Sequence, residues 1–247
     1  MPRFFVSPAA MAGDTVMIEG EDCRHIALSL RMAVGDTVTL SDGQGQEALC
    51  RLTAITPTHV EAAVLSRGAG QGELPIEVYL YQGNPKGDKL ELIVQKAVEL
   101  GACAVIPFES SRCVARIKAE RAEKQTARMQ RIANEAAGQC GRARLLQVLP
   151  PLSYADALRD AAARCDATLL CYEDEKTTTL RAALGRLREA QCRRIGLFVG
   201  SEGGFSPEEA AAAQAQGAVS VSLGRRILRC ETAPLYALSC IGYTYEE

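Results

Sequence analysis

Residues 197–209 read LFVGSEGGFSPEE, and this stretch indicates the fold of the larger part of the chain. An apolar run ends at Val199, a glycine-rich turn follows, and a helix starts after Ser206. Ser206 and Glu209 have the spacing of a capping box, and Pro207 occupies the first helical position. A strand that passes through a glycine loop into a capped helix is the building unit of a parallel α/β sheet.

This alternation of strand and helix fills the chain from residue 76 onward. The predicted strands are Ile76–Gln82, Ala104–Phe108, Ala167–Tyr172, Ile195–Val199 and Val219–Leu223. The predicted helices are Asp88–Leu100, Lys118–Gly138, Tyr154–Arg164, Thr178–Gln191, Pro207–Gln216 and one from Thr232 to about Tyr243. The pattern predicts a parallel sheet that helices cover on both faces.

The first 65 residues follow a different pattern, in which short strands alternate with turns. The predicted strands are Thr15–Ile18, Thr37–Leu40, Ala48–Leu52 and His59–Leu65. A short helix is predicted at Asp22–Leu30, and a glycine-rich linker at Arg67–Pro75. Short, regularly spaced strands favour a small β-barrel. The chain thus divides into a barrel at residues 1–72 and an α/β domain at residues 73–247.

Composition and charge narrow the class of protein. Of the 247 residues, 47% are hydrophobic and 23% charged, and the formal net charge is −2, as in ordinary globular proteins. The sequence has no apolar run long enough to span a bilayer, and Met1–Val6 lacks the features of a signal peptide. We therefore expect a cytoplasmic protein with no membrane partner. The ten cysteines include no C-x-x-C pair, so we expect reduced thiols and no metal site.

One segment is strongly basic although the whole chain has a slightly negative net charge. Between Ser110 and Arg144 the sequence contains nine basic and three acidic residues. Four of the basic residues recur at intervals of three or four and share one face of a predicted helix: Arg121, Lys124, Arg128 and Arg131. Such a face is typical of a phosphate-binding patch, although an ordinary solvated helix gives the same pattern.

A second glycine loop follows the last predicted strand. Gly224 is succeeded by Arg225, Arg226 and Arg229, beside Glu231. Two loops at strand ends can surround one small molecule with backbone amides. The first loop has neither the lysine and hydroxyl of a P-loop nor the G-x-G-x-x-G spacing, and both loops come late in the chain. The residues by themselves therefore predict a ligand site of unidentified class.

Cys230 offers an alternative chemistry, because Arg229 next to it could lower its pKa. No histidine accompanies it in this region, and thiols readily fill small apolar spaces. A cysteine-dependent enzyme would lose activity in Cys230→Ala, whereas a space-filling thiol predicts near-normal turnover.

Several segments, in order along nearly the whole chain, resemble the RsmE-type 16S ribosomal RNA uridine-N3 methyltransferases of the SPOUT superfamily. The matching segments are Arg3-Phe4, His25, Leu30-Arg31, Gly35-Asp36, Lys96, Glu99–Gly101, Ser111-Arg112, Glu135–Arg142, Glu202–Ser206 and Leu223–Ala233. Two positions depart from the family pattern: Ser201 replaces a usual proline and Val98 a usual threonine. Neither change removes a charged group, so we expect activity to survive.

The resemblance implies a PUA-like RNA-binding barrel at 1–72 and a SPOUT methyltransferase domain with a C-terminal trefoil knot at 73–247. It also implies S-adenosylmethionine as methyl donor, 16S ribosomal RNA of the small ribosomal subunit as partner, a homodimer and no metal. The implied donor-binding residues are Leu170, Gly200, Glu202, Gly203, Gly204, Leu223, Gly224, Arg226, Ile227 and Leu228. The implied catalytic residues are Arg229, Glu231, Arg142 and Glu135. The expected RNA contacts are Arg3, Arg24, Arg31, Arg112, Arg121, Lys124 and Arg128.

Two alternatives stay open at this stage. The chain could be another SPOUT methyltransferase, acting on transfer RNA or on a ribose hydroxyl, or a non-catalytic RNA-binding assembly factor. The sequence also leaves open which group takes the N3 proton and whether free RNA suffices as substrate.

Overall fold

A computed structural model describes residues 1–56, 58–116 and 119–246. The chain forms two compact units. Unit 1 comprises Met1–Glu73 and Ala137–Leu145, and unit 2 comprises Leu74–Ala136 and the chain from Leu146 onward. The predicted first residue of the long basic helix, Lys118, lies outside the described residues.

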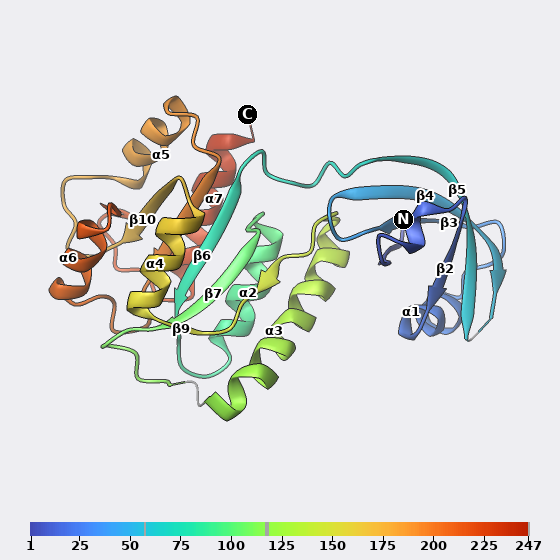
Figure 1. Ribbon diagram of the computed structural model, residues 1–247, viewed down its shortest axis with the longest axis horizontal. Helices are drawn as coiled ribbons and strands as arrows, with labels where there is room; N and C mark the ends of the chain where they lie inside the picture. Colours follow the sequence, from blue (N-terminus) through green and yellow to red (C-terminus); the bar gives the residue numbers. More distant parts are fainter. Residues whose placement is uncertain (57, 117–118, 247) are drawn as a thin grey trace. The chain divides into compact units, whose positions relative to one another are not determined.

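Unit 1 is built on a mixed five-stranded sheet that curls around its own core (Figure 1). Its strands are β1 (Arg3–Phe5), β2 (Thr15–Glu19), β3 (Thr37–Ser41), β4 (Gln46–Ile55) and β5 (His59–Ala69), in the order β1-β3-β4-β5-β2. β1 and β3 pair in parallel, and the other pairings among the described residues of this unit are antiparallel. Residues alternate inward and outward along β2, so Val16 and Ile18 are buried while Thr15 and Met17 are exposed.

Three details of unit 1 differ from the sequence prediction. Strand β1 was not predicted, since three residues are too few to show a period. The predicted helix is a short α1 (Glu21–Arg24) followed by a π-helical turn, His25–Ser29. The predicted linker is wrong at its start, because Arg67–Ala69 still belongs to β5 and pairs with Gln46–Ala48 of β4. Gly68 does not interrupt the strand, because Glu47 of β4 pairs with it.

Unit 2 contains a sheet whose described strands all pair in parallel. Its strands are β6 (Glu77–Gly83), β7 (Ala104–Glu109), β8 (Gln147–Val148), β9 (Leu152–Ser153), β10 (Ala167–Cys171), β11 (Arg194–Val199) and β12 (Val219–Val221). Their order is β12-β10-β11-β6-β7-β8, with β9 beside β7. The parallel sheet is confirmed; β8 and β9 were missed because each has only two residues.

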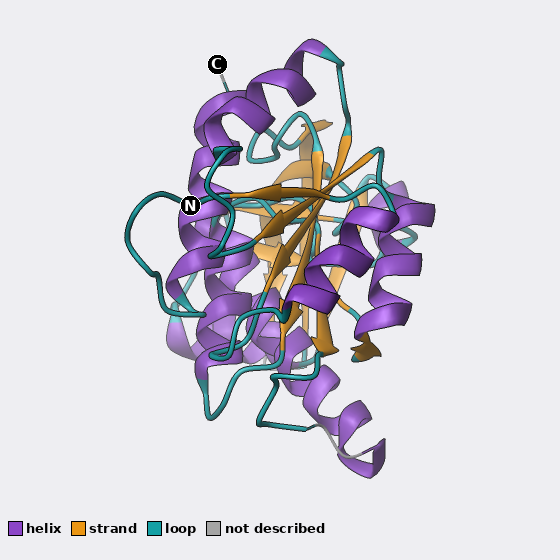
Figure 2. Cartoon of the chain, turned by 90° about the vertical axis from the view of Figure 1, so that its left-hand side faces the viewer, coloured by secondary structure: helices purple, strands orange, loops and turns teal. Residues whose placement is uncertain are grey.

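Helices cover both faces of this sheet, as predicted (Figures 1 and 2). They are α2 (Lys89–Glu99), α3 (Ala119–Cys140), α4 (Tyr154–Arg164), α5 (Leu180–Glu189), α6 (Pro207–Ala215) and α7 (Thr232–Tyr245). On one face, α4 and α6 pack on Phe108 and Phe198. On the other, α7 contacts both α2 and α5. Burial on both faces explains why the strand sequences read as continuous apolar runs.

The start of α6 has the predicted capping box. The Ser206 hydroxyl accepts a hydrogen bond from the Glu209 amide, and the Glu209 carboxylate accepts one from the Ser206 amide. Pro207 stands at the first helical position, where it has no amide to leave unsatisfied. This cap fixes the point at which the first glycine loop ends.

Candidate functional site

Three adjacent strands of unit 2 end at the same level of the sheet. Cys171 at the end of β10 lies opposite Val199 of β11 on one side and Val221 of β12 on the other. The loops that follow these strands therefore emerge side by side. Ligands of open α/β sheets bind outside such carboxyl ends, so this edge is where a site is expected.

The three loops enclose a cavity of about 400 Å³. Nine predicted site residues line it: Gly200, Glu202, Gly204, Leu223, Gly224, Arg226, Ile227, Leu228 and Arg229. Nine further lining residues were not predicted as site residues: Lys89, Cys171, Tyr172, Glu173, Val199, Ser201, Ser222, Cys230 and Ala233. The two glycine loops thus meet around one cavity, as the sequence suggested.

The first glycine loop turns back on itself too tightly for a side chain at Gly200. The Gly204 amide donates to the Ser201 carbonyl at 3.0 Å, and Gly204 has a φ of +62°. A Cβ at Gly200 would stand 2.9 Å from the Gly204 Cα, and one at Gly83 would stand 2.5 Å from the Ser201 amide nitrogen. Real Cβ atoms do not approach that closely, so the loop depends on glycine at these positions.

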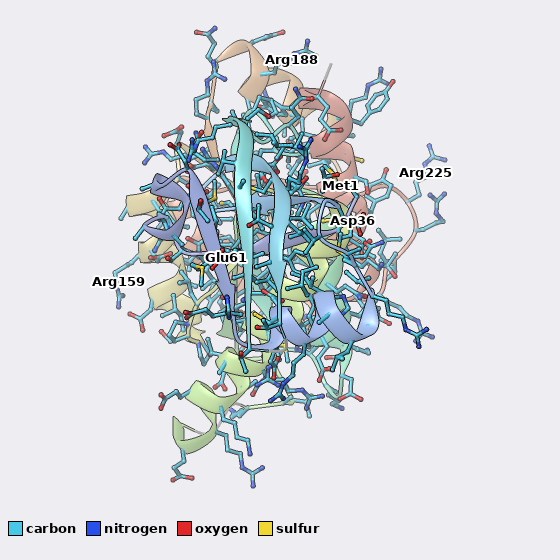
Figure 3. The ribbon with its side chains drawn as sticks, turned by 90° about the vertical axis from the view of Figure 1, so that its right-hand side faces the viewer. Met1, Asp36, Glu61, Arg159, Arg188 and Arg225 are labelled. Atoms are coloured by element: carbon cyan, nitrogen blue, oxygen red, sulfur yellow. The ribbon has the colours of Figure 1, made fainter. Side chains whose placement is uncertain are left out.

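The second glycine loop is open and highly charged. Gly224 has a φ of +111°, and its amide donates to the Ser222 hydroxyl at 3.2 Å. The arginines at 225, 226 and 229 are exposed. Ile227 in the same loop is 82% exposed. The labelled Arg225 side chain extends outward from its loop (Figure 3).

A cluster of charged side chains joins α2 to both loops. Lys89 Nζ, in the first turn of α2, lies 2.9 Å from Glu202 Oε1 and 3.3 Å from Glu231 Oε2. The Lys86 amide also donates to Glu202, at 3.1 Å. The Cys230 thiol donates to Glu231 at 3.2 Å. Glu231 itself ends the second loop and precedes α7.

These contacts keep Lys89, Glu202 and Glu231 ionised near neutral pH. Hydrogen bonding to Glu202 raises the pKa of Lys89. Burial raises the pKa of Glu202 and of Glu231, but hydrogen bonds from Lys89 and from backbone amides outweigh it, so each pKa lies below its ordinary value. Both carboxylates are consequently ionised and are weak bases.

The Cys230 thiol is not activated. Burial, followed by its hydrogen bond to Glu231, raises its pKa to about 12. A thiol that stays protonated neither attacks carbon nor binds metal. The geometry therefore favours a space-filling role for Cys230 over cysteine-dependent catalysis.

We expect iodoacetamide at pH 8 to alkylate Cys230 far more slowly than the exposed Cys140. An ordinary thiol pKa of 9.0 is raised to about 12 at Cys230, so its thiolate fraction falls by about three orders of magnitude. Peptide mass spectrometry over a time course measures both rates. Equal rates would show that Cys230 is accessible and ionised, contrary to its surroundings.

Two of the predicted donor-binding residues do not line the cavity. Leu170 is buried in the core beneath α4 and α6, because side chains alternate along β10 and Cys171 faces the site instead. Gly203 turns toward Arg112, whose Nη1 donates to its carbonyl at 3.2 Å. Ser201, at the departure from the family pattern, keeps its place in the loop with its hydroxyl 3.5 Å from the Arg112 carbonyl.

Arg142 and Glu135, which the sequence also predicts to be catalytic, are not among the residues that line the cavity. Arg142 belongs to unit 1 and is 4% exposed. Its Nη2 lies 2.6 Å from Glu73 Oε2, and Glu73 Oε1 also accepts from the amides of Ala143 and Arg144. Glu135 is an exposed residue of α3 in unit 2. The structure thus gives Arg142 a structural contact that the sequence did not predict.

The predicted RNA-contacting residues are mostly exposed. In unit 1, Arg3 pairs with Glu47, and Arg24 and Arg31 are exposed. In unit 2, Arg112 is exposed, and so is the α3 set, Arg121, Lys124 and Arg128. Arg128 also pairs with Glu91 at 2.7 Å. Exposed arginines at such spacing suit a phosphate backbone, but they would equally suit a solvated surface.

The cavity fits S-adenosylmethionine in size and lining. Its volume lies within the range of small-molecule pockets, and its wall combines apolar side chains with glycine backbone. At Gly200 there is no room for a Cβ, which would stand 2.9 Å from the Gly204 Cα, so backbone forms the cavity wall there. Nowhere in the described part of the chain do three or more His, Cys, Asp or Glu side chains gather as metal ligands would. Across the described ranges, no helix is long and apolar enough to cross a membrane.

Comparison with known proteins agrees with this site. Residues 72–242 match the RNA methyltransferase domain family, and residues 18–65 match the RNA methyltransferase PUA domain. Fold and site together therefore define an RNA methyltransferase. A Bacillus subtilis protein named ribosomal RNA small subunit methyltransferase E is 36% identical over 251 residues, with 100% of this chain and 98% of its own length covered. The chain belongs to the ribosomal RNA small subunit methyltransferase E family.

Two further relatives support this assignment. A Mycobacterium tuberculosis protein of the same name is 32% identical, with 97% of this chain and 90% of its own length covered. The crystal structure of a ribosomal RNA small subunit methyltransferase E from Neisseria gonorrhoeae, described as bound to S-adenosylmethionine, superposes with a TM-score of 0.85. It is 33% identical and covers 99% of this chain and 98% of its own.

Proposed function

We propose that this chain transfers a methyl group from S-adenosylmethionine to N3 of a specific uridine in 16S ribosomal RNA of the small ribosomal subunit. The observation that carries the proposal is the cavity at the ends of β10, β11 and β12, which both glycine loops line. The names of the relatives support a ribosomal RNA substrate, and the Neisseria gonorrhoeae structure supports the donor.

The chemistry defines what the protein has to supply. Uridine N3 carries an imide proton and is a poor nucleophile until that proton leaves. When bound, S-adenosylmethionine supplies an electrophilic methyl group on a sulfonium centre. The residues of the chain then have to align N3 with this methyl group and stabilise negative charge on the uracil ring.

Each part of the site has a role in this proposal. The backbone amides of the glycine loops bind the donor, and Arg229, which lines the cavity, stabilises the uridine anion. Glu231 is held ionised beside Lys89 and acts as a hydrogen-bond acceptor, because its lowered pKa makes it a weak base. Glu135 stays a proposed contact to the target base. Arg142 acts by holding the chain at 142–144 through Glu73.

The proposal extends to the architecture. Residues 1–72 would be a PUA-like barrel that binds RNA, and residues 73–247 a SPOUT domain whose C-terminal segment forms a trefoil knot. The exposed basic residues of α3 would contact phosphates. A homodimer is supported by exposed apolar side chains on the contacting helices α2 and α7, namely Leu92, Tyr236 and Tyr243. The site of action would be the cytoplasm.

Two measurements separate this function from its rivals. Calorimetry with S-adenosylmethionine should show stoichiometric binding, whereas a non-catalytic assembly factor that has lost the donor site would show none at millimolar donor. Transfer of labelled methyl groups should occur onto unmethylated small ribosomal subunits and not onto transfer RNA. Label on transfer RNA alone would assign the chain to a different substrate.

A further inference from the structure

The cluster of Lys89, Glu202 and Glu231 carries an unequal number of charges. One ammonium group contacts two carboxylates, at 2.9 and 3.3 Å, and lowered pKa values keep both carboxylates ionised. The cluster therefore has a formal charge of −1. Lys89 and Glu202 line the cavity directly, and Glu231 follows the lining residue Cys230.

This charge is better shielded from solvent than the others at the site. The side chains of Lys89, Glu202 and Glu231 are 32%, 29% and 18% exposed. Arg226 and Arg229 also line the cavity but belong to the exposed class, as does the lining carboxylate of Glu173. Charges in water are screened, whereas partly buried ones act through a lower effective dielectric. Solvent therefore screens the half-buried cluster less than it screens the exposed charges of the cavity wall.

We propose that the Lys89–Glu202–Glu231 cluster makes the cavity select a cationic ligand over a neutral ligand of the same shape, and so distinguishes the sulfonium donor from its thioether product. This inference rests on the proposed function. Lys89 sets the size of the effect, because it cancels one of the two negative charges of the cluster, of which Glu202 lines the cavity and Glu231 lies behind Lys89. It is a positioning residue that acts through the two carboxylates.

The cavity can distinguish donor from product because the sulfur loses its positive charge in the reaction. The bond between sulfur and the methyl carbon breaks, and its electron pair remains on sulfur. The N3 lone pair forms the new bond to carbon, and the N3 proton passes to water. The sulfonium thus becomes the neutral thioether S-adenosylhomocysteine, which loses its attraction to the cluster. Weaker binding of the product would speed its exchange for a new donor.

Calorimetry with three ligands tests the inference in the full-length protein. The ligands are S-adenosylmethionine, S-adenosylhomocysteine and sinefungin, in which a protonated amine replaces the methyl sulfonium. Glu202→Gln should lower the affinity for the two cationic ligands about tenfold and leave that for S-adenosylhomocysteine nearly unchanged. Lys89→Met should shift the ratio of cationic to neutral affinity about tenfold in the opposite direction. Lys89→Arg should preserve the wild-type ratio.

A matched control is available on the same helix. Lys96 and Glu99 form a comparable ion pair at 2.8 Å, with side chains 35% and 30% exposed, outside the cavity lining. Glu99→Gln should leave all three affinities unchanged. If Glu202→Gln and Lys89→Met alter all three affinities by one common factor, the cluster only shapes the cavity and the inference is wrong. If the wild-type protein binds no S-adenosylmethionine, the proposed function itself fails.

Discussion

Replacing Gly200 by alanine is expected to weaken S-adenosylmethionine binding by at least about tenfold and to lower the free energy of unfolding by about 1–3 kcal/mol. The added Cβ would stand 2.9 Å from the Gly204 Cα and 3.0 Å from its carbonyl carbon. Both are backbone atoms, so no side chain can rotate away to make space. The loop has to open, and opening it displaces Glu202 and Gly204 from the cavity wall.

Gly185→Ala is the matched control for this change. Gly185 is exposed in α5, and a Cβ there would have no neighbour within 4 Å. Alanine within a helix stabilises it by about 0.5–1 kcal/mol relative to glycine. Calorimetry and thermal unfolding of the two variants compare the positions directly. Wild-type donor affinity in Gly200→Ala would mean that the first glycine loop does not form the donor site.

Replacing Glu73 by glutamine is expected to cost about 3 kcal/mol of stability in unit 1. One carboxylate accepts hydrogen bonds from the Arg142 guanidinium and from the amides of Ala143 and Arg144. Arg142 is 4% exposed, so removing the negative charge leaves a guanidinium buried beside a neutral amide. The amide would also turn a donor toward groups that need an acceptor.

Glu61→Gln provides the corresponding control in the same unit. Glu61 is 41% exposed, pairs with His59 at 3.6 Å and is labelled on β5 in Figure 3. Surface pairs of this kind contribute little, so we expect a change within about 0.5 kcal/mol. Urea unfolding measures both variants. If Glu73→Gln alters turnover but leaves stability unchanged, Arg142 is a catalytic group and the structural role assigned to it is wrong.

The elements of unit 2 that could be predicted are those whose own residues determine where they begin and end. Strand Ile195–Val199 and helix Pro207–Gln216 were predicted nearly to the residue, because burial on both faces and a capping box leave clear marks in the sequence. The strand order left no such mark. β12 is the last strand along the chain, yet it lies at the sheet edge beside β10 and not beside β11. The two glycine loops meet only because of this strand order, which no local sequence pattern indicates.

The candidate site was predictable where its residues lie in the loops themselves. Lys89 was missed because it is 113 positions from Glu202, and nothing in a helix-starting lysine indicates a distant carboxylate. Leu170 stays a predicted donor contact through its backbone, and its side chain packs in the core with residues of α4 and α6. Neighbouring side chains of a strand point to opposite faces of the sheet. The side chain of Cys171, one residue further along β10, therefore lines the cavity.

Mapping the modified atom distinguishes methylation of uridine N3 in 16S ribosomal RNA from every other product. Small ribosomal subunits that lack the modification would be incubated with the protein and labelled S-adenosylmethionine, and the RNA digested and analysed by mass spectrometry. We expect 3-methyluridine at one position of the 16S RNA. A methyl group on a ribose hydroxyl or on any other base atom, or no transfer at all, would contradict it.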